Sequence, residues 1–175
     1  MTTPALKPLP GTAFPIDPRV RIGHGHLKVS DLDRALMFYC GVLGFELMQR
    51  IGDEAAFLSA GGYHHHLGLN TWDSRGGTKP AAGTTGLYHV AVLYPDRAAL
   101  AVALRRLHQA GIELTGASDH GVSEALYLDD PDGNGLELYW DRPPEAWPRN
   151  PDGTLAMYTR RLDVTALLAE TEPDA

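Results

Sequence analysis

The chain has 175 residues, of which 43% are hydrophobic and 21% charged. This balance excludes a disordered protein and a coiled coil, and it suits one domain with a substantial buried core. The formal net charge of -7 argues against general nucleic-acid binding, which requires a cationic face. No apolar run approaches the roughly 20 residues that span a bilayer. The proline-containing segment after Met1 lacks the apolar core of a secretory signal, so we expect a cytoplasmic protein with no membrane or nucleic-acid partner.

The first elements form a β-α-β-β-β unit over residues 21–72, preceded by an irregular arm over residues 1–20. An extended stretch over 19–29 favours a strand, and Ser30 is the expected N-cap of the helix that follows it. Apolar residues recur at helical spacing until Gly44, a typical helix stop. Three short strands are then predicted over 45–51, 55–60 and 64–70, separated by glycine-containing turns.

The same order returns after a glycine-rich linker over residues 73–85. The second module, residues 86–142, is predicted to have a strand over 87–94 and a helix that begins after Asp96 and ends at Gly111. Strands follow over 112–115, 124–129 and 136–140, the last two joined by a turn at Asp130–Gly135. Residues 143–175 are expected to form a tail with a short helix over 164–169.

The two modules also share residues. His24 precedes an Asp-Arg-Ala helix start at Asp33, and His89 precedes the same start at Asp96. Each module is too small to bury both faces of its own sheet. We therefore predict an α+β fold in which two paired βαβββ modules form one cupped mixed β-sheet with the helices outside.

Three side chains from these modules point to a metal site. His24 and His89 occupy matching places on the two first strands, so their imidazoles are expected to converge near a pseudo-twofold axis. Glu137 lies between Leu136 and Leu138, and strand alternation therefore directs its carboxylate away from the leucines. Two histidines and one carboxylate match the ligand set of a non-haem Fe(II) facial triad.

The order of these motifs resembles a known family. The first module resembles that of the vicinal oxygen chelate superfamily in the motifs His24-x-x-Leu-x-Val and Val-Leu-Gly-Phe at 42–45. The second module is similar in Tyr-His-Val-Ala-Val at 88–92 and Asp-Pro-Asp-Gly-Asn-Gly-Leu-Glu-Leu-Tyr at 130–139. This superfamily includes glyoxalases, bleomycin resistance proteins and extradiol dioxygenases. The His-His-His-Leu-Gly-Leu run at 64–69 and Asp-His-Gly-Val-Ser at 119–123 look most like the catechol 2,3-dioxygenase branch in a single-domain form.

The resemblance implies a ring-cleaving extradiol dioxygenase that acts on a catechol-like aromatic diol with O2, a reaction of aromatic catabolism. It assigns His24, His89 and Glu137 as metal ligands, with Fe(II) as the expected metal and Mn(II) or another divalent metal as the alternative. His65 falls where extradiol enzymes carry an acid/base histidine, and Tyr127 falls where they carry an active-site tyrosine. His120, in a glycine-flanked loop, is a further candidate that could close over substrate.

Other members of the superfamily leave alternatives open. His66 precedes Leu67-Gly68, where glyoxalase-like members carry a Glu ligand, so it could act as a fourth ligand, and the strand register leaves open whether His65 or His66 is the acid/base residue. The first alternative function is a glyoxalase-type metal-dependent lyase or isomerase, and the second is a non-enzymatic small-molecule binding or resistance protein. A homodimer is expected on base rates alone.

Overall fold

The computed structural model describes residues 16–170. Its first module contains a four-stranded sheet in the order β1-β4-β3-β2, in which β1 runs parallel to β4 and the other pairs are antiparallel. Its elements are β1 (Gly25–Lys28), α1 (Leu32–Leu36), the π-helix η1 (Met37–Val42), β2 (Glu46–Ile51), β3 (Ala55–Ser59) and β4 (Leu67–Asn70).

The second module repeats this arrangement with a five-stranded sheet in the order β5-β8-β7-β6-β9, in which β5 runs parallel to β8. Its elements are β5 (Val90–Leu93), α2 (Arg97–Gln109), β6 (Gly116–Asp119), β7 (Ser123–Asp129) and β8 (Gly135–Asp141). The C-terminal segment adds the 3-10 helix η2 (Pro144–Ala146), β9 (Arg160–Arg161) and α3 (Val164–Ala169).

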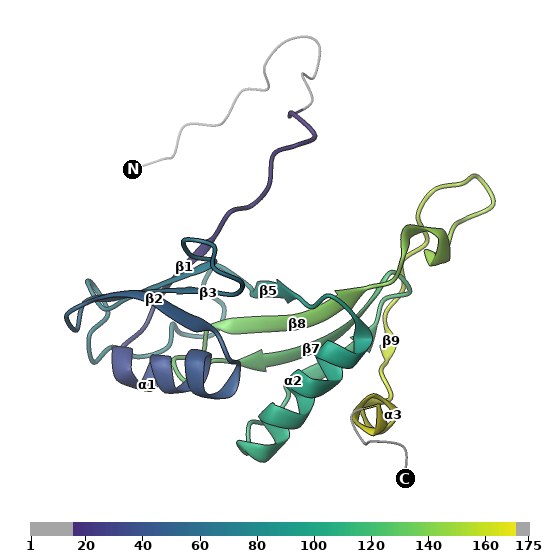
Figure 1. Cartoon of the computed structure of the whole chain (residues 1–175). Coiled ribbons are helices and arrows are strands. Elements are labelled where there is room, and N and C mark those ends of the chain that lie inside the picture. The colour runs from purple at the N-terminus through teal and green to yellow at the C-terminus, as the bar shows by residue number, and fades with distance from the viewer. Residues whose placement is uncertain (1–15, 171–175) are drawn as a thin grey trace.

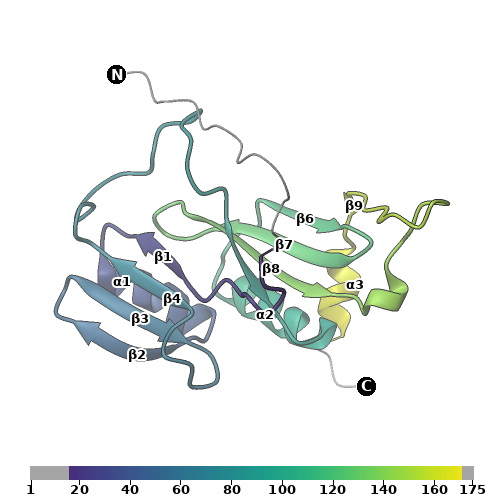
Figure 2. The same ribbon diagram turned by 90° about the horizontal axis from the view of Figure 1, so that it is seen from above.

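The two sheets lie side by side, with α1 and α2 against the same face (Figures 1 and 2). They meet where β1 approaches β5, since a Cβ added to Gly25 would lie 3.4 Å from the Val90 side chain. The α+β class and the doubled β-α-β-β-β order are confirmed. In the described residues, the expected single cupped sheet is two separate hydrogen-bonded sheets, one in each module.

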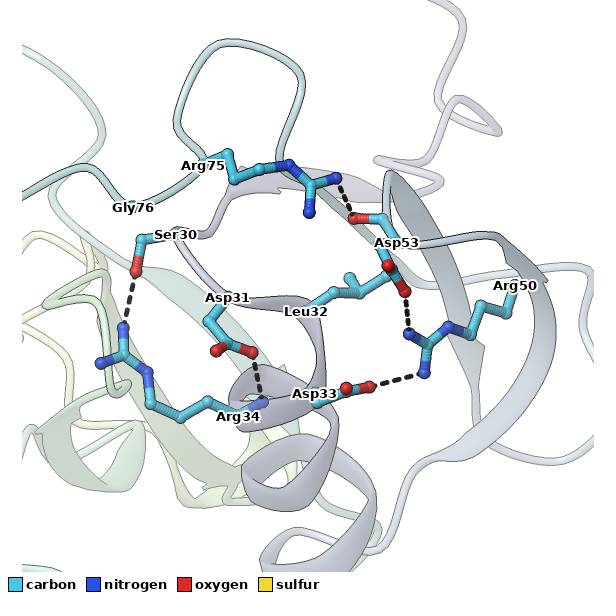
Figure 3. Close-up of a pocket in the computed structure, with 9 residues that line it drawn as sticks. All are labelled: Ser30, Asp31, Leu32, Asp33, Arg34, Arg50, Asp53, Arg75 and Gly76. Atoms are coloured by element: carbon cyan, nitrogen blue, oxygen red, sulfur yellow. Dashed lines mark hydrogen bonds and ion pairs between the residues drawn. The ribbon is translucent and has the colours of Figure 1, made fainter.

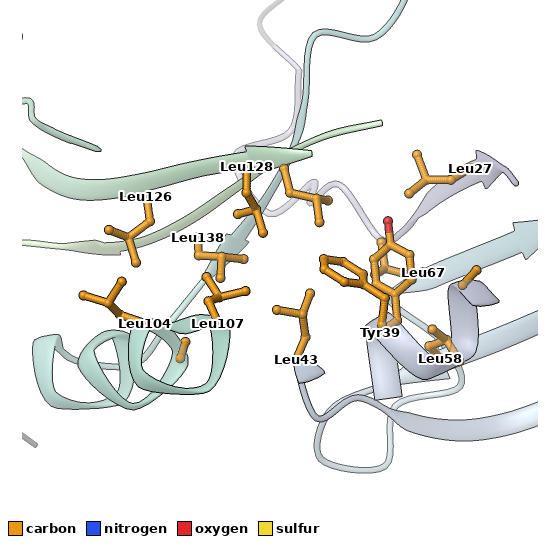
Figure 4. Close-up of a cluster of buried hydrophobic side chains, with 14 of the residues drawn as sticks. Leu27, Tyr39, Leu43, Leu58, Leu67, Leu104, Leu107, Leu126, Leu128 and Leu138 are labelled. Carbon is orange, nitrogen blue, oxygen red and sulfur yellow. The ribbon is translucent and has the colours of Figure 1, made fainter. Parts of the chain in front are cut away.

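One leucine-rich core lies between the sheets and the helices. Leu104 and Leu107 of α2 pack in the same buried cluster as Leu138 of β8. Leu43 of the first module lies between these leucines and Tyr39 (Figure 4). Leu136 and Leu138 are 1% and 0% exposed. The alternation predicted for β8 is therefore present, and the carboxylate of Glu137 lies on the face away from α2.

Polar contacts also connect the modules. The Tyr39 hydroxyl in η1 donates to Asp130 in the turn after β7, at 2.9 Å, and both side chains are buried. Burial, followed by the negative charge of Asp130, raises the pKa of Tyr39 well above its usual value. Arg34 forms an ion pair with Asp132 of the same turn at 2.6 Å. The turn that precedes Glu137 is thus anchored to the first helical segment.

Three local predictions were wrong. Ser30 is not the N-cap of α1, because its backbone N–H and its hydroxyl both donate to Asp132; Asp31 caps the helix instead, accepting from the Arg34 N–H. The strand expected over 112–115 lies at Gly116–Asp119, where register with β7 pairs Gly116 with Tyr127.

The third concerns the histidine run. It was expected within a strand over 64–70, but β4 begins only at Leu67, so the three histidines lie in the loop before it. The π-helical turns of η1, the two-residue strand β9 and its pairing with β6 were not predicted. The helix after Asp96, with Asp96 as its N-cap, and the short helix over 164–169 are confirmed. Of the arm over 1–20 and the tail over 143–175, residues 1–15 and 171–175 lie outside the described residues.

No helix among residues 16–170 is long and apolar enough to cross a membrane.

Candidate active site

Four predicted site residues form one chain of polar contacts on the second sheet. The first contact joins His89 Nε2 to Glu137 Oε2 at 3.0 Å, and the second joins the Tyr127 hydroxyl to Glu137 Oε1 at 2.9 Å. The third joins His120 Nε2 to the Tyr127 hydroxyl at 2.8 Å. His89 precedes β5, whereas the other three residues come from β7, β8 and the turn after β6, and the pairing of these strands brings all four together.

The register of the strands explains this alignment. Tyr127 of β7 pairs directly with Glu137 of β8, and directly paired residues of antiparallel strands project from the same face. On the other side of β8, Glu137 pairs with Ala91 of β5, and His89 lies two residues earlier along the same chain direction. The carboxylate of Glu137 is therefore flanked by a tyrosine from one neighbouring strand and by a histidine preceding the other.

Burial beside the carboxylate changes the acidity of the neighbouring hydroxyl. The pKa of Tyr127 is raised above its usual value, first by burial and then by the hydrogen bond and the negative charge of Glu137. Tyr127 therefore keeps its proton near neutral pH and can act as a hydrogen-bond donor. The pKa of Asp141, further along β8, is also raised, first by burial and then by repulsion from Glu137.

The remaining predicted residues gather at the first module. The rings of His24 and His65 lie with their centroids 4.4 Å apart, and His64 Nδ1 lies 2.8 Å from His65 Nδ1. The rings of Phe57 of β3 and His65 make a T-shaped contact with their centroids 5.0 Å apart. Desolvation is the largest cause that lowers the pKa of His65, and the neighbouring imidazoles, His24 first, lower it further. The neutral imidazole, which can accept a proton, is therefore favoured.

His66 points to a different partner. Its Nδ1 accepts from the backbone N–H of Ala60 at 3.3 Å and lies 3.2 Å from the Ser59 hydroxyl. These contacts hold the His66 ring at the end of β3, while His65 lies beside His24. Of the two histidines, His65 is thus the one placed next to a predicted metal ligand.

The donor atoms fit a divalent metal in part. His89 Nε2 and Glu137 Oε2 lie 3.0 Å apart, and imidazole nitrogen and carboxylate oxygen are both donor types that bind divalent metals. The other nitrogen of His89, Nδ1, is buried and has no hydrogen-bond partner in the described residues. No three His, Cys, Asp or Glu side chains of residues 16–170 form a group that could hold a metal ion, so His24 does not join this pair in the structure.

Sequence reasoning missed the contacts that hold His120. Its Nδ1 lies 3.0 Å from the backbone carbonyl oxygen of Tyr158 and 3.2 Å from the Thr159 hydroxyl. These partners are 38 and 39 residues away, in a segment that was predicted only as a tail. No motif or periodicity connects the two regions, which come together through the pairing of β9 with β6 and the backbone hydrogen bond from Tyr158 to His120.

A separate charged pocket of about 460 Å³ opens beside α1 (Figure 3). Its charges are largely paired within the pocket: Arg50 binds Asp33 and Asp53 at 2.6 and 2.8 Å, and Arg75 donates to the Asp53 backbone carbonyl. None of the predicted site residues lines it. This pocket is therefore distinct from the contacts around Glu137.

Comparison with known proteins gives one family. The model of the Glyoxalase/Bleomycin resistance protein/Dioxygenase superfamily matches residues 21–138. A catechol-2,3-dioxygenase of Bacillus subtilis is 46% identical over 149 residues, which is 85% of this chain and 51% of the relative. A biphenyl-2,3-diol 1,2-dioxygenase of Rhodococcus globerulus is 31% identical over 69% of this chain and 63% of the relative. The chain thus spans about half the length of the first relative and less than two thirds of the second.

A solved structure shows the same fold. A glyoxalase/dioxygenase from Nostoc punctiforme superposes with a TM-score of 0.60, with coverage of 76% of this chain and all of that one, at 18% sequence identity.

Proposed function

Because the chain belongs to the Glyoxalase/Bleomycin resistance protein/Dioxygenase superfamily, we propose that it is a metal-dependent extradiol dioxygenase that cleaves the ring of a catechol-like substrate with O2. The observation that carries the proposal is the 46% identity to a catechol-2,3-dioxygenase over 85% of this chain. The chain of contacts from His89 to His120 supports it, because it places an imidazole, a carboxylate and a phenol in direct succession.

In this proposal His89 and Glu137 hold the metal, and His24 supplies the third ligand. Imidazole nitrogens and a carboxylate oxygen suit Fe(II), with Mn(II) or another divalent metal as the alternative. Bound Fe(II) would supply open coordination positions for the two oxygens of a catechol and for O2.

The protein side chains then manage protons and position the substrate. His65 is the base for a catechol hydroxyl, because desolvation, followed by its neighbouring imidazoles, lowers its pKa and favours the neutral imidazole. Tyr127 keeps its hydroxyl proton and directs it toward Glu137. This hydrogen bond fixes one carboxylate oxygen and leaves the other, Oε2, beside His89. His120, at the outer end of the chain of contacts, can exchange a proton through Tyr127.

The direct test is oxygen uptake by the full-length protein. The protein is purified without oxygen, loaded with Fe(II), and given catechol or a substituted catechol while O2 consumption and the yellow ring-fission product are followed. We expect uptake that depends on Fe(II), and Glu137→Ala should lose both metal retention and activity. Glu113→Ala, at an exposed carboxylate, is the matched control and should retain both.

The results also separate the alternatives. Isomerisation of a glutathione hemithioacetal without O2 uptake would assign the protein to glyoxalase-type chemistry and contradict the dioxygenase. Failure to bind Fe(II) or any other divalent metal would contradict both enzymatic functions and favour a binding protein.

A further inference from the structure

The segment after β8 returns to the second sheet and closes against His120. β9 extends that sheet by pairing with β6, with Asp119 opposite Arg160 and Ser118 opposite Arg161 (Figure 2). Just before this pairing, the Tyr158 backbone N–H donates to the His120 carbonyl at 3.2 Å. Tyr158 and Thr159 are therefore held beside His120 by backbone pairing, although they lie beyond the residues 21–138 matched by the family model.

Gly121 allows this close approach. Its φ of +78° lies in the left-handed region, and an added Cβ would come within 2.6 Å of the Tyr158 ring and 2.8 Å of Pro148. A side chain at this position would push the C-terminal segment away from the neighbouring His120. The turn is thus shaped to receive the segment.

The partners of His120 differ in what they can donate. A carbonyl oxygen only accepts, so Tyr158 can pair with Nδ1 only when Nδ1 carries a proton. A hydroxyl can also donate, so Thr159 can pair with Nδ1 when Nδ1 is unprotonated. The same nitrogen therefore has a partner in either neutral tautomer of the ring.

The tautomer of His120 affects the hydrogen bonding of Glu137 because both residues contact the Tyr127 hydroxyl, which has only one proton to donate. When Nδ1 carries the imidazole proton, Nε2 is an acceptor, and the Tyr127 hydroxyl can donate to it across 2.8 Å. When Nε2 carries the proton, it donates to the Tyr127 oxygen, and the hydroxyl proton of Tyr127 is directed to Glu137 across 2.9 Å. The ring loses a proton at one nitrogen and takes one at the other, so its charge does not change.

We propose that the Tyr158 carbonyl and the Thr159 hydroxyl position His120 in both neutral tautomers and thereby determine whether Tyr127 donates to His120 or to Glu137. Tyr158 and Thr159 are positioning residues, since each acts through His120. The catalytic use of this arrangement, an adjustable hydrogen bond to a metal-binding carboxylate, rests on the proposed function. The arrangement itself is a property of the metal-free protein.

The test measures the tautomer of His120 directly. Full-length protein labelled with ¹⁵N-histidine is studied without metal by long-range ¹H–¹⁵N NMR, and His120→Gln identifies the His120 signals. Thr159→Val removes the hydroxyl at an exposed position and keeps the shape of the side chain. It should shift the tautomer ratio about three- to tenfold toward the form protonated at Nδ1, the effect of one lost hydrogen bond.

Two further variants provide the controls. Thr159→Ser restores the hydroxyl and should restore the wild-type ratio. Thr154→Val removes a hydroxyl of the same segment that binds Asp152 rather than His120, and it should leave the ratio unchanged. The inference is overturned if Thr159→Val leaves the His120 signals as in the wild type, or if Thr154→Val shifts them equally.

A kinetic measurement separates this inference from the proposed function. With Fe(II) and a catechol, Thr159→Val should lower kcat more than it changes KM, and Thr159→Ser should recover kcat. Absence of O2 uptake in the wild type would contradict the proposed function, while the NMR result would still decide the inference. Normal uptake with an unchanged tautomer ratio in Thr159→Val would contradict the inference alone.

Discussion

The neighbours of each histidine side chain give it a distinct chemistry. His89 has a carboxylate partner at 3.0 Å, whereas His65 is surrounded by other imidazoles and the Phe57 ring. His89 and Glu137 bring together an imidazole nitrogen and a carboxylate oxygen, both donor types that bind divalent metals, whereas desolvation, followed by the neighbouring imidazoles, favours the neutral form of His65. One residue type is therefore suited to metal binding beside Glu137 and to proton acceptance beside His24.

At this scale we predict that His65→Ala retains the metal and loses turnover. If His65 is the base for the catechol hydroxyl, kcat should fall by about 10²–10⁴-fold, while Fe(II) binding measured by titration stays near the wild-type value. His108→Ala, at an exposed position on α2, is the control and should change neither quantity. Equal loss of Fe(II) binding and of kcat in His65→Ala would contradict this separation of roles.

The elements of the second module are joined by a group of buried and half-buried charges. Glu124 at the start of β7 is 6% exposed and accepts from Arg97 at 2.6 Å and from Arg142 at 2.8 Å. Arg142, directly after β8, also donates to Asp119 of β6 at 2.6 Å. Arg97 of α2 forms a second ion pair with Glu170, beside α3. These pairs link one end of the strands β6, β7 and β8 to α2 and the C-terminal helix.

The Asp119 carboxylate makes this group sensitive to acid. Burial alone would raise the pKa of Asp119, but hydrogen bonds from Arg142 and from the Gly121 N–H, with the charge of Arg142, lower it below the usual 3.8. A lowered folded-state pKa means that the ionised carboxylate stabilises the fold. This stabilisation is complete above the unfolded-chain pKa and disappears as the pH falls through the lower folded-state pKa.

We therefore predict that Asp119→Asn lowers the free energy of unfolding by about 1 kcal/mol at pH 7. The difference from the wild type should shrink as the pH falls below 3.8 and should vanish once the wild-type carboxyl is protonated. Urea denaturation at a series of pH values measures this, with Asp73→Asn, an exposed partner of Lys28, as the control. A difference that stays constant down to the lowest pH would show that the charge of Asp119 does not stabilise the fold.

At the scale of the whole molecule, the two modules share one core and are joined by the buried hydrogen bond from Tyr39 to Asp130. The hydroxyl of Tyr39 in the first module reaches Asp130 in the second, whose carboxylate also accepts from two backbone N–H groups of its own turn. The turn leads directly into β8 and Glu137. Loss of this contact should therefore affect the stability of both modules together.

For Tyr39→Phe we predict a loss of about 1.5–3 kcal/mol in the free energy of unfolding, the contribution of a hydrogen bond to a charged group. Unfolding is followed by tryptophan fluorescence in two proteins, one with Trp72 of the first module as its single tryptophan and one with Trp140 of the second, the other tryptophans being replaced by Phe. In Tyr39→Phe both fluorescence signals should shift to lower denaturant together, as in two-state unfolding. Tyr63→Phe, on an exposed ring, should shift neither, and separate transitions for the two signals in Tyr39→Phe would show that the modules unfold independently.

The sequence by itself determined the repeated element order, the core-facing leucines of β8 and the opposite face for Glu137. These follow from local periodicity: helical spacing and strand alternation are properties of neighbouring residues, so a short segment carries the signal. The conspicuous histidines and the ordered motifs also indicated the family.

Only the tertiary structure decided which side chains meet. Ser30 lost its expected capping role to a contact with Asp132, 102 residues away. The three consecutive histidines lie in the loop before β4 and not in the strand. Tyr158 and Thr159, which contact His120, belong to a segment with no distinctive sequence pattern. Such contacts depend on the register of strands distant in sequence and on the free energy of packing the whole chain, and no short stretch of residues records either.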